Sequence, residues 1–179
     1  MTIAVQGDTY RYNENENTRK TAAVVGWVPA GRDVTVTFTP AAAAYLAGDT
    51  MDVAKEIALI GPTIGGSINI ISTELMVEHT AVISGETSYT LHLYSVTPPS
   101  ALADNAVWDI PSGDRASYLG SLALGTPVDV GSTLYVQTLN IQKQVKVPVG
   151  GSLFAYLVTN GPFTATAAIR RVTIHAQVL

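Results

Sequence analysis

The chain of 179 residues contains no cysteine and few charged side chains. Without cysteine it forms no disulfide, no thiolate nucleophile and no cysteine-ligated zinc site. Asp, Glu, Lys and Arg make up 13% of the residues, about half of their usual share in globular proteins. Because 47% of the residues are hydrophobic, stability must come from packing or from association. We therefore expect a homo-oligomer, with a trimer favoured.

Long apolar runs and basic clusters are missing as well. No stretch approaches the ~18 apolar residues of a membrane-spanning helix, and residues 1–20 lack the basic-then-apolar order of a secretion signal. The 10 basic and 14 acidic residues give a formal net charge of −4. Nucleic-acid binders usually carry a basic stripe, whereas Lys143 and Lys146 form only a sparse pair here. We expect neither a membrane nor a nucleic acid as a partner.

The beginning of the chain differs from the rest. The run from Asn13 to Asn17 is polar and has no apolar period, and such a segment buries too little surface to order itself. This pattern predicts an extended N-terminal arm over residues 1–30 and a folded domain over residues 31–179; the alternative is a frayed terminus. The candidate partner-binding residues of the arm are its separated apolar anchors, Ile3, Val5, Tyr10 and Tyr12.

The periodicity from residue 31 onward is mostly two, which is the period of a half-buried strand. Val34, Val36 and Phe38 alternate with threonines. The same alternation recurs at residues 89–94, 134–138, 145–149 and 171–178. Short strands separated by glycine and proline turns predict an all-β fold, a single β-sandwich that is jelly-roll-like.

Two details interrupt this pattern. Residues 67–78 favour a strand, but their apolar phase changes, which predicts a bulge near Ile70 and Ile71. The alanine-rich segment from Ala41 to Leu46, which follows Pro40, is the one place where a short helix is expected.

The stretch from Val96 to Ser117 has no sustained strand period. Loops of this length in a compact domain are usually functional or packed by their own side chains. Trp108, with Leu102 and Ile110, is therefore expected either to pin an ordered crossover to the body or to contact a partner. On the second interpretation Trp108 is a further candidate partner-binding residue.

Residues suited to chemistry are scattered. His92 and His175 occupy the polar phase of their strands, where solvated or interface positions explain them. Asp104, Asp109 and Asp114 recur at every fifth residue, but they do not match a calcium loop, and turn formation accounts for them. No serine or threonine stands in a recognisable nucleophile pattern. We predict no catalytic residue, no metal site and no cofactor, in a protein that is not an enzyme.

Several sequence strings in the second half of the chain are familiar. They lie at residues 91–94, 97–105, 113–115, 118–120, 125–129 and 131–136. These strings resemble a group of small virion-associated proteins of tailed bacteriophages, and the similarity covers residues 89–159. The resemblance implies a structural role in the particle, as a capsid decoration (cement) protein that binds and stabilises the head shell. It supplies no catalytic residues.

The resemblance also implies a partner and a location. The major capsid protein would be the partner, and the outer capsid surface of the virion the location, after synthesis in the host cytoplasm. A head-fibre or tail module with the same fold is the alternative. Such a module would bind a receptor or glycan through exposed aromatic residues such as Tyr94, Trp108 and Tyr118.

Overall fold

The alternating segments of the sequence form strands. The computed structural model describes residues 30–179, within which residues 31–179 form one compact unit. β12 (Arg170–Val178) buries every second side chain, and β1 (Gly31–Phe38) pairs with it in antiparallel register from Gly31 to Phe38. β-branched residues such as Val172 and Ile174 suit this half-buried, pleated surface. Residues 1–29, which include the arm anchors, lie outside the described residues.

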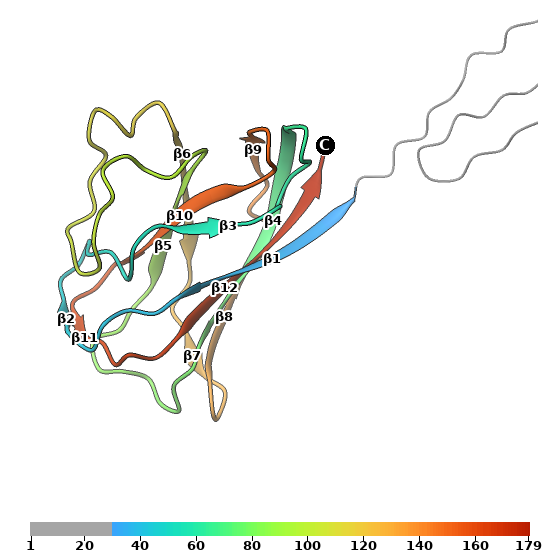
Figure 1. Ribbon diagram of the computed structural model, residues 1–179. Coiled ribbons are helices and arrows are strands. Elements are labelled where there is room, and N and C mark those ends of the chain that lie inside the picture. The colour runs from blue at the N-terminus through green and yellow to red at the C-terminus, as the bar shows by residue number, and fades with distance from the viewer. Residues whose placement is uncertain (1–29) are drawn as a thin grey trace, which may run out of the picture. The chain divides into compact units, whose positions relative to one another are not determined.

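Two antiparallel sheets build the sandwich (Figure 1). The larger sheet has the order β1, β12, β4 (Gly66–Val77), β8 (Leu134–Thr138) and β7 (Val128–Asp129), and β9 (Lys143–Val147) also pairs with β4. The smaller sheet has the order β3 (Lys55–Ile57), β10 (Leu153–Thr159), β5 (Tyr89–Tyr94) and β6 (Tyr118–Leu124). A short separate pair consists of β2 (Ala44–Tyr45) and β11 (Phe163–Thr164).

The strand pairing follows a jelly roll. β5 pairs with β6, β4 with both β8 and β9, β3 with β10, and β1 with β12. The chain is thus one long antiparallel hairpin that wraps across two sheets, so that early strands pair with late ones. The prediction of an all-β, jelly-roll-like β-sandwich is confirmed.

One hydrophobic core fills the space between the sheets. Phe38, Ile68 and Ile174 enter it from the larger sheet, and Leu91 and Leu157 enter it from the smaller sheet. All five side chains are fully buried. Burying one side chain of this size is worth roughly 1.5–3 kcal/mol, so this cluster is the main source of stability in a chain without disulfides.

A β-bulge bends β4 in the middle of the larger sheet. β4 pairs with β12 in one register as far as Ser72, and the pairing resumes with Ile70 opposite Ala176. Ile71 is therefore the extra residue, and it is exposed while Ile70 is buried. The bulge predicted near Ile70 and Ile71 is confirmed.

The helix expected from Ala41 to Leu46 is wrong. Ala44 and Tyr45 instead pair with Thr164 and Phe163, and the Tyr45 ring is buried against the Phe163 ring at 6.1 Å between centroids. So short a segment gains little from helical hydrogen bonds alone, and the burial of Tyr45 outweighs its alanine content. Residues 30–179 contain no helix, and thus none long and apolar enough to cross a membrane.

Candidate partner-binding site

The loop between β5 and β6 covers the outer face of the smaller sheet (Figure 1). Tyr94, Tyr156 and Val158 point to this face and form a second buried cluster, against which Leu102 and Trp108 of the loop pack. The indole of Trp108 stacks on the His92 ring at 3.6 Å between centroids. Its Nε1–H donates a hydrogen bond of 3.2 Å to the Tyr94 hydroxyl. Trp108 thus fixes an ordered crossover loop to the body of the domain, which is the first of the two roles expected for it.

His92 is buried beneath this loop. Its exposed fraction is 8%, and its Nδ1 lies 3.0 Å from the Tyr118 hydroxyl. Burial lowers the pKa of His92 to about 4, because a charged imidazolium is poorly solvated there. The expectation of a solvated or interface position is wrong for His92, since the loop seals the polar phase of β5. His175 is part-exposed on the larger sheet and lies 2.8 Å from Asp33.

Asp104 and Asp114, two of the three aspartates considered for calcium, fix the backbone of the covering loop and its neighbours. The Asp104 carboxylate accepts hydrogen bonds from the Tyr45 hydroxyl at 2.8 Å, and from the backbone N–H of Asp52 at 2.7 Å and of Ala41 at 2.8 Å. Asp114 accepts hydrogen bonds from the backbone N–H and the hydroxyl of Ser100. Within residues 30–179 no group of three or more His, Asp or Glu side chains is placed to hold a metal ion.

A buried ionic network, which could not be predicted from the sequence, lies where β5 and β12 begin. The Arg170 guanidinium is fully buried and lies 3.0 Å from Glu86. It also donates a hydrogen bond of 2.9 Å to the Tyr89 hydroxyl and sits 5.5 Å from the centre of the Phe163 ring. Burial raises the pKa of Tyr89. Removing one partner of such a pair typically costs about 3–5 kcal/mol, so the network is structural.

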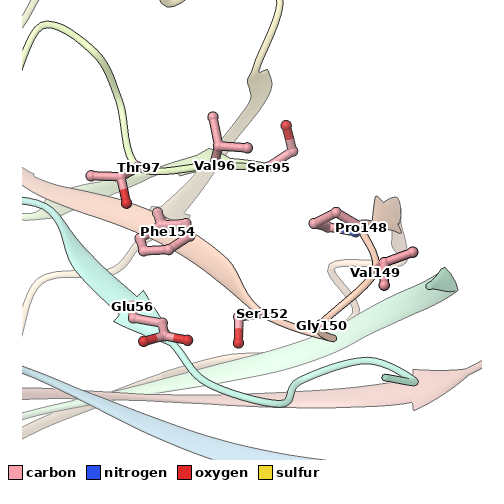
Figure 2. Close-up of a pocket in the computed structure, with 9 residues that line it drawn as sticks. All are labelled: Glu56, Ser95, Val96, Thr97, Pro148, Val149, Gly150, Ser152 and Phe154. Atoms are coloured by element: carbon pink, nitrogen blue, oxygen red, sulfur yellow. The ribbon is translucent and has the colours of Figure 1, made fainter. Parts of the chain in front are cut away.

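A groove lies beside the first residues of the covering loop. It has a volume of about 440 Å³ and lies between the start of the loop at Ser95–Thr97, the turn at residues 148–152, and the neighbouring strands β3 and β10. Glu56 and Phe154 are cross-strand partners and form its floor (Figure 2). Glu56 makes no ion pair or side-chain hydrogen bond with the other residues of the described chain. The groove is therefore the uncovered part of the smaller sheet's outer face.

Of the sequence-predicted site residues, Trp108 lies within the described part of the chain. Trp108 is half-buried and engaged within the chain. Ile3, Val5, Tyr10 and Tyr12 lie outside the described residues, so their role stays a prediction. The groove was not predicted from the sequence because its residues come from three separate segments and form no motif.

Comparison with known proteins adds similarities of fold alone. No protein family and no curated protein sequence matches the chain. Among solved structures, the VP2 subviral particle of infectious bursal disease virus aligns with a TM-score of 0.39 and 12% identity, over 96% of this chain and 38% of that one. The empty head of turnip yellow mosaic virus aligns with a TM-score of 0.25 and 12% identity, over 94% of this chain and 89% of that one.

The chain spans well under half of the bursal disease virus protein that it matches. The assignment to the jelly-roll class depends on the strand order and not on these alignments. The resemblance to virion proteins of tailed bacteriophages stays a prediction.

Proposed function

We propose that the protein is a non-enzymatic structural component of a virion, and specifically a decoration protein on the outer surface of a tailed-phage head. The observation that carries the proposal is the jelly-roll strand order, because viral capsid domains are a principal user of this fold. The sequence resemblance over residues 89–159 supports the same assignment. The major capsid protein is the proposed partner, and a homotrimer the proposed assembly.

The use made of the polar residues is consistent with a structural role. Arg170, Asp104 and Asp114 each bind groups of their own chain and hold strands and loops in place. A decoration protein needs a rigid body and contact surfaces, and its polar side chains are free to serve the fold. An enzyme would need some of them directed towards a substrate.

Copy number in purified particles tests the proposal. Quantitative mass spectrometry against the major capsid protein should find hundreds of copies per particle, and a cryo-electron microscopy map should place the sandwich on the outside of the shell. A count of only a few copies, or density confined to the tail, would contradict the decoration role.

The arm is proposed to attach the protein to the shell or to sister subunits. Fully extended residues span at most ~3.3–3.6 Å each, so residues 1–20 would reach roughly 65–70 Å. Removing residues 1–20 should weaken binding to particles that lack the protein, while the melting temperature of the body stays unchanged. Equal binding by the truncated and full-length chains would reduce the segment to a frayed terminus.

A second candidate is a head-fibre or tail module that binds a glycan, since lectin domains also use jelly rolls. Two of the three aromatic residues expected to stack on a sugar do not suit it, because Tyr94 is fully buried and Trp108 is stacked on His92. The third, Tyr118, is half-buried, and its hydroxyl lies 3.0 Å from Nδ1 of His92. The observation that keeps this candidate is the groove, in which Phe154 lies beside the carboxylate of Glu56. A glycan array would test it, with Glu56→Gln expected to abolish any binding found.

A further inference from the structure

Two hollows lie next to each other on the outer face of the smaller sheet. The first is the groove of about 440 Å³, whose floor is formed by Glu56 and Phe154. The second is a smaller pit of about 120 Å³, and Tyr156 and Leu102 are among its lining residues. Thr97 lines both hollows, so a single ligand can occupy the groove and the pit together.

The pit is apolar. Apart from Thr97, it is lined by aliphatic side chains and by Tyr156, whose hydroxyl already accepts a hydrogen bond of 2.8 Å from the Leu102 N–H. An apolar cavity of about 150 Å³ holds a benzene-sized group, so a pit of about 120 Å³ suits a small aliphatic side chain such as that of valine.

The groove, in contrast, carries an uncompensated negative charge. Glu56 lines it and has no cationic partner within residues 30–179, because the neighbouring Lys55 pairs with Asp52 at 2.9 Å. Other charged residues at this end of the molecule belong to the larger sheet and do not line the groove: Arg32, Asp33 and Lys146. The carboxylate is therefore available to a cation from outside the described chain.

The neighbour of this carboxylate is an aromatic ring. Glu56 and Phe154 stand directly opposite each other on β3 and β10 (Figure 2), which places their Cβ atoms about 4.5–5.5 Å apart. A guanidinium group is planar, so it can lie on the ring while its N–H groups face the carboxylate. The hydroxyls of Ser95 and Thr97, which also line the groove, can accept from the remaining N–H groups. The groove thus favours an arginine side chain.

The spacing of the two hollows matches an extended peptide. Phe154 in the groove and Tyr156 in the pit are two residues apart on β10 and pack together on its outer face. Two residues of a strand span about 6.6–6.8 Å, and side chains two positions apart point to the same side. An extended segment can therefore place one side chain in each hollow.

We propose that the groove and the pit bind an extended peptide segment of a partner protein, in which an arginine and a small aliphatic residue stand two positions apart. The arginine lies between Phe154 and Glu56, and the aliphatic residue enters the pit beside Tyr156. The net charge of −4 also favours the approach of a basic segment. The inference goes beyond the proposed function and does not depend on it, because isolated chain and synthetic peptides suffice to test it.

Two-dimensional NMR of the full-length chain provides the test. The probes are two capped pentapeptides of glycine with valine and arginine at the second and fourth positions, in either order. At least one should give saturable shifts in the backbone amides of residues 95–102 and 148–156. Replacing arginine by citrulline, which has a similar shape and no charge, should weaken binding about tenfold. A second glycine between valine and arginine should weaken it several-fold.

Substitution of the carboxylate tests the role of Glu56 directly. Glu56→Gln should weaken binding of the arginine peptide about tenfold and leave binding of the citrulline peptide unchanged. The matched control is Glu78→Gln, which removes an exposed carboxylate that pairs with Arg171 on the larger sheet, and it should bind like the wild type. Both variants should keep the wild-type melting temperature, because each alters an exposed side chain.

Several results would overturn the proposal. They are the absence of saturable shifts with both pentapeptides, equal binding of the arginine and citrulline peptides, full binding by Glu56→Gln, and an equal loss in Glu78→Gln. Saturable shifts of the same amides with a glycan but not with a peptide would assign the groove to a sugar instead. The citrulline comparison uses only the wild-type chain, so it decides the outcome even if a variant fails to fold.

Discussion

The two sheets of the sandwich have outer faces of opposite character. The larger sheet presents polar pairs to solvent, such as Thr35 with Thr173 at 2.8 Å and Gln137 with Glu74 at 3.1 Å. The smaller sheet presents Tyr94 and Tyr156, which are fully buried beneath the loop from β5 to β6. Cross-strand polar pairs make a face compatible with water, whereas a face of large aromatic residues needs a cover. The long loop covers the smaller sheet, whose outer face is aromatic, and the larger sheet, whose outer face is polar, needs no such cover.

The largest expected effect strikes the core that both faces share. Leu91→Asp should prevent folding, because an unpaired charge there costs several kcal/mol, a large part of the roughly 5–15 kcal/mol that keeps a domain folded. Its counterpart on the open face, Thr35→Asp, should shift stability by less than about 1 kcal/mol. Far-UV circular dichroism and thermal melting would check both variants. A cooperative melt of Leu91→Asp near the wild-type temperature would contradict the core assignment.

Truncation of the covering tryptophan should sharpen the contrast between the faces. Trp108→Ala removes the stack on His92 and should cost about 2–3 kcal/mol, somewhat less than for a fully buried aromatic residue. Tyr135→Ala, the matched change on the open face opposite Met76, should cost under about 1 kcal/mol. Urea unfolding measures both. Equal losses would mean that the loop does not seal the smaller sheet.

Acid should loosen the covered face through His92. Its pKa falls from 6.5 unfolded to about 4 folded, so the unfolded chain binds more protons between these values. The resulting stability is fully present above pH 6.5 and is lost as the pH falls to 4, by about 3 kcal/mol. Unfolding free energies of the wild type between pH 4 and pH 7 should show this slope. His92→Gln should remove it, and an unchanged slope would contradict the burial of His92.

The smallest expected effect is that of a chelator on the covering loop. The carboxylates of Asp104 and Asp114 already accept hydrogen bonds from amide and hydroxyl groups of the chain. The melting temperature should therefore be the same with and without excess EDTA. A clear drop that added calcium reverses would revive a metal role for these aspartates.

Alternation predicted β1, β5, β8, β9 and β12, because one face of each is buried in a common core, but it did not predict β6. It located β1 through Val34, Val36 and Phe38, and a change of phase in β4 located the bulge at Ile71. The two-residue and three-residue strands, β2, β3, β7 and β11, are too short to show a period. Tyr45 lies in β2, and its burial could not be predicted because its partner Phe163 is distant in sequence. The alanine-rich segment around it therefore predicts a helix.

The sequence could not show which of the outward-facing strand residues are exposed to solvent. His92 and His175 both follow the polar phase of a strand, yet only His92 is buried, because Trp108 folds back over it from a separate loop. The burial of the Arg170 guanidinium could not be predicted either, because its partners Glu86 and Tyr89 come from other parts of the chain. Contacts of this kind depend on tertiary arrangement and leave no local pattern.

The interruption between β8 and β9 sets a rule for length changes in this region. Thr138 pairs with Thr73 and Lys143 pairs with Ile70. Four residues therefore lie between β8 and β9, whereas only two residues of β4 lie between their partners. Asn140 and Gln142 take up the excess at φ values of 58° and 52°. Side chains alternate with a period of two. Homologous chains that lose a residue pair here would keep Val145 facing inward, whereas loss of a single residue would turn β9 inside out.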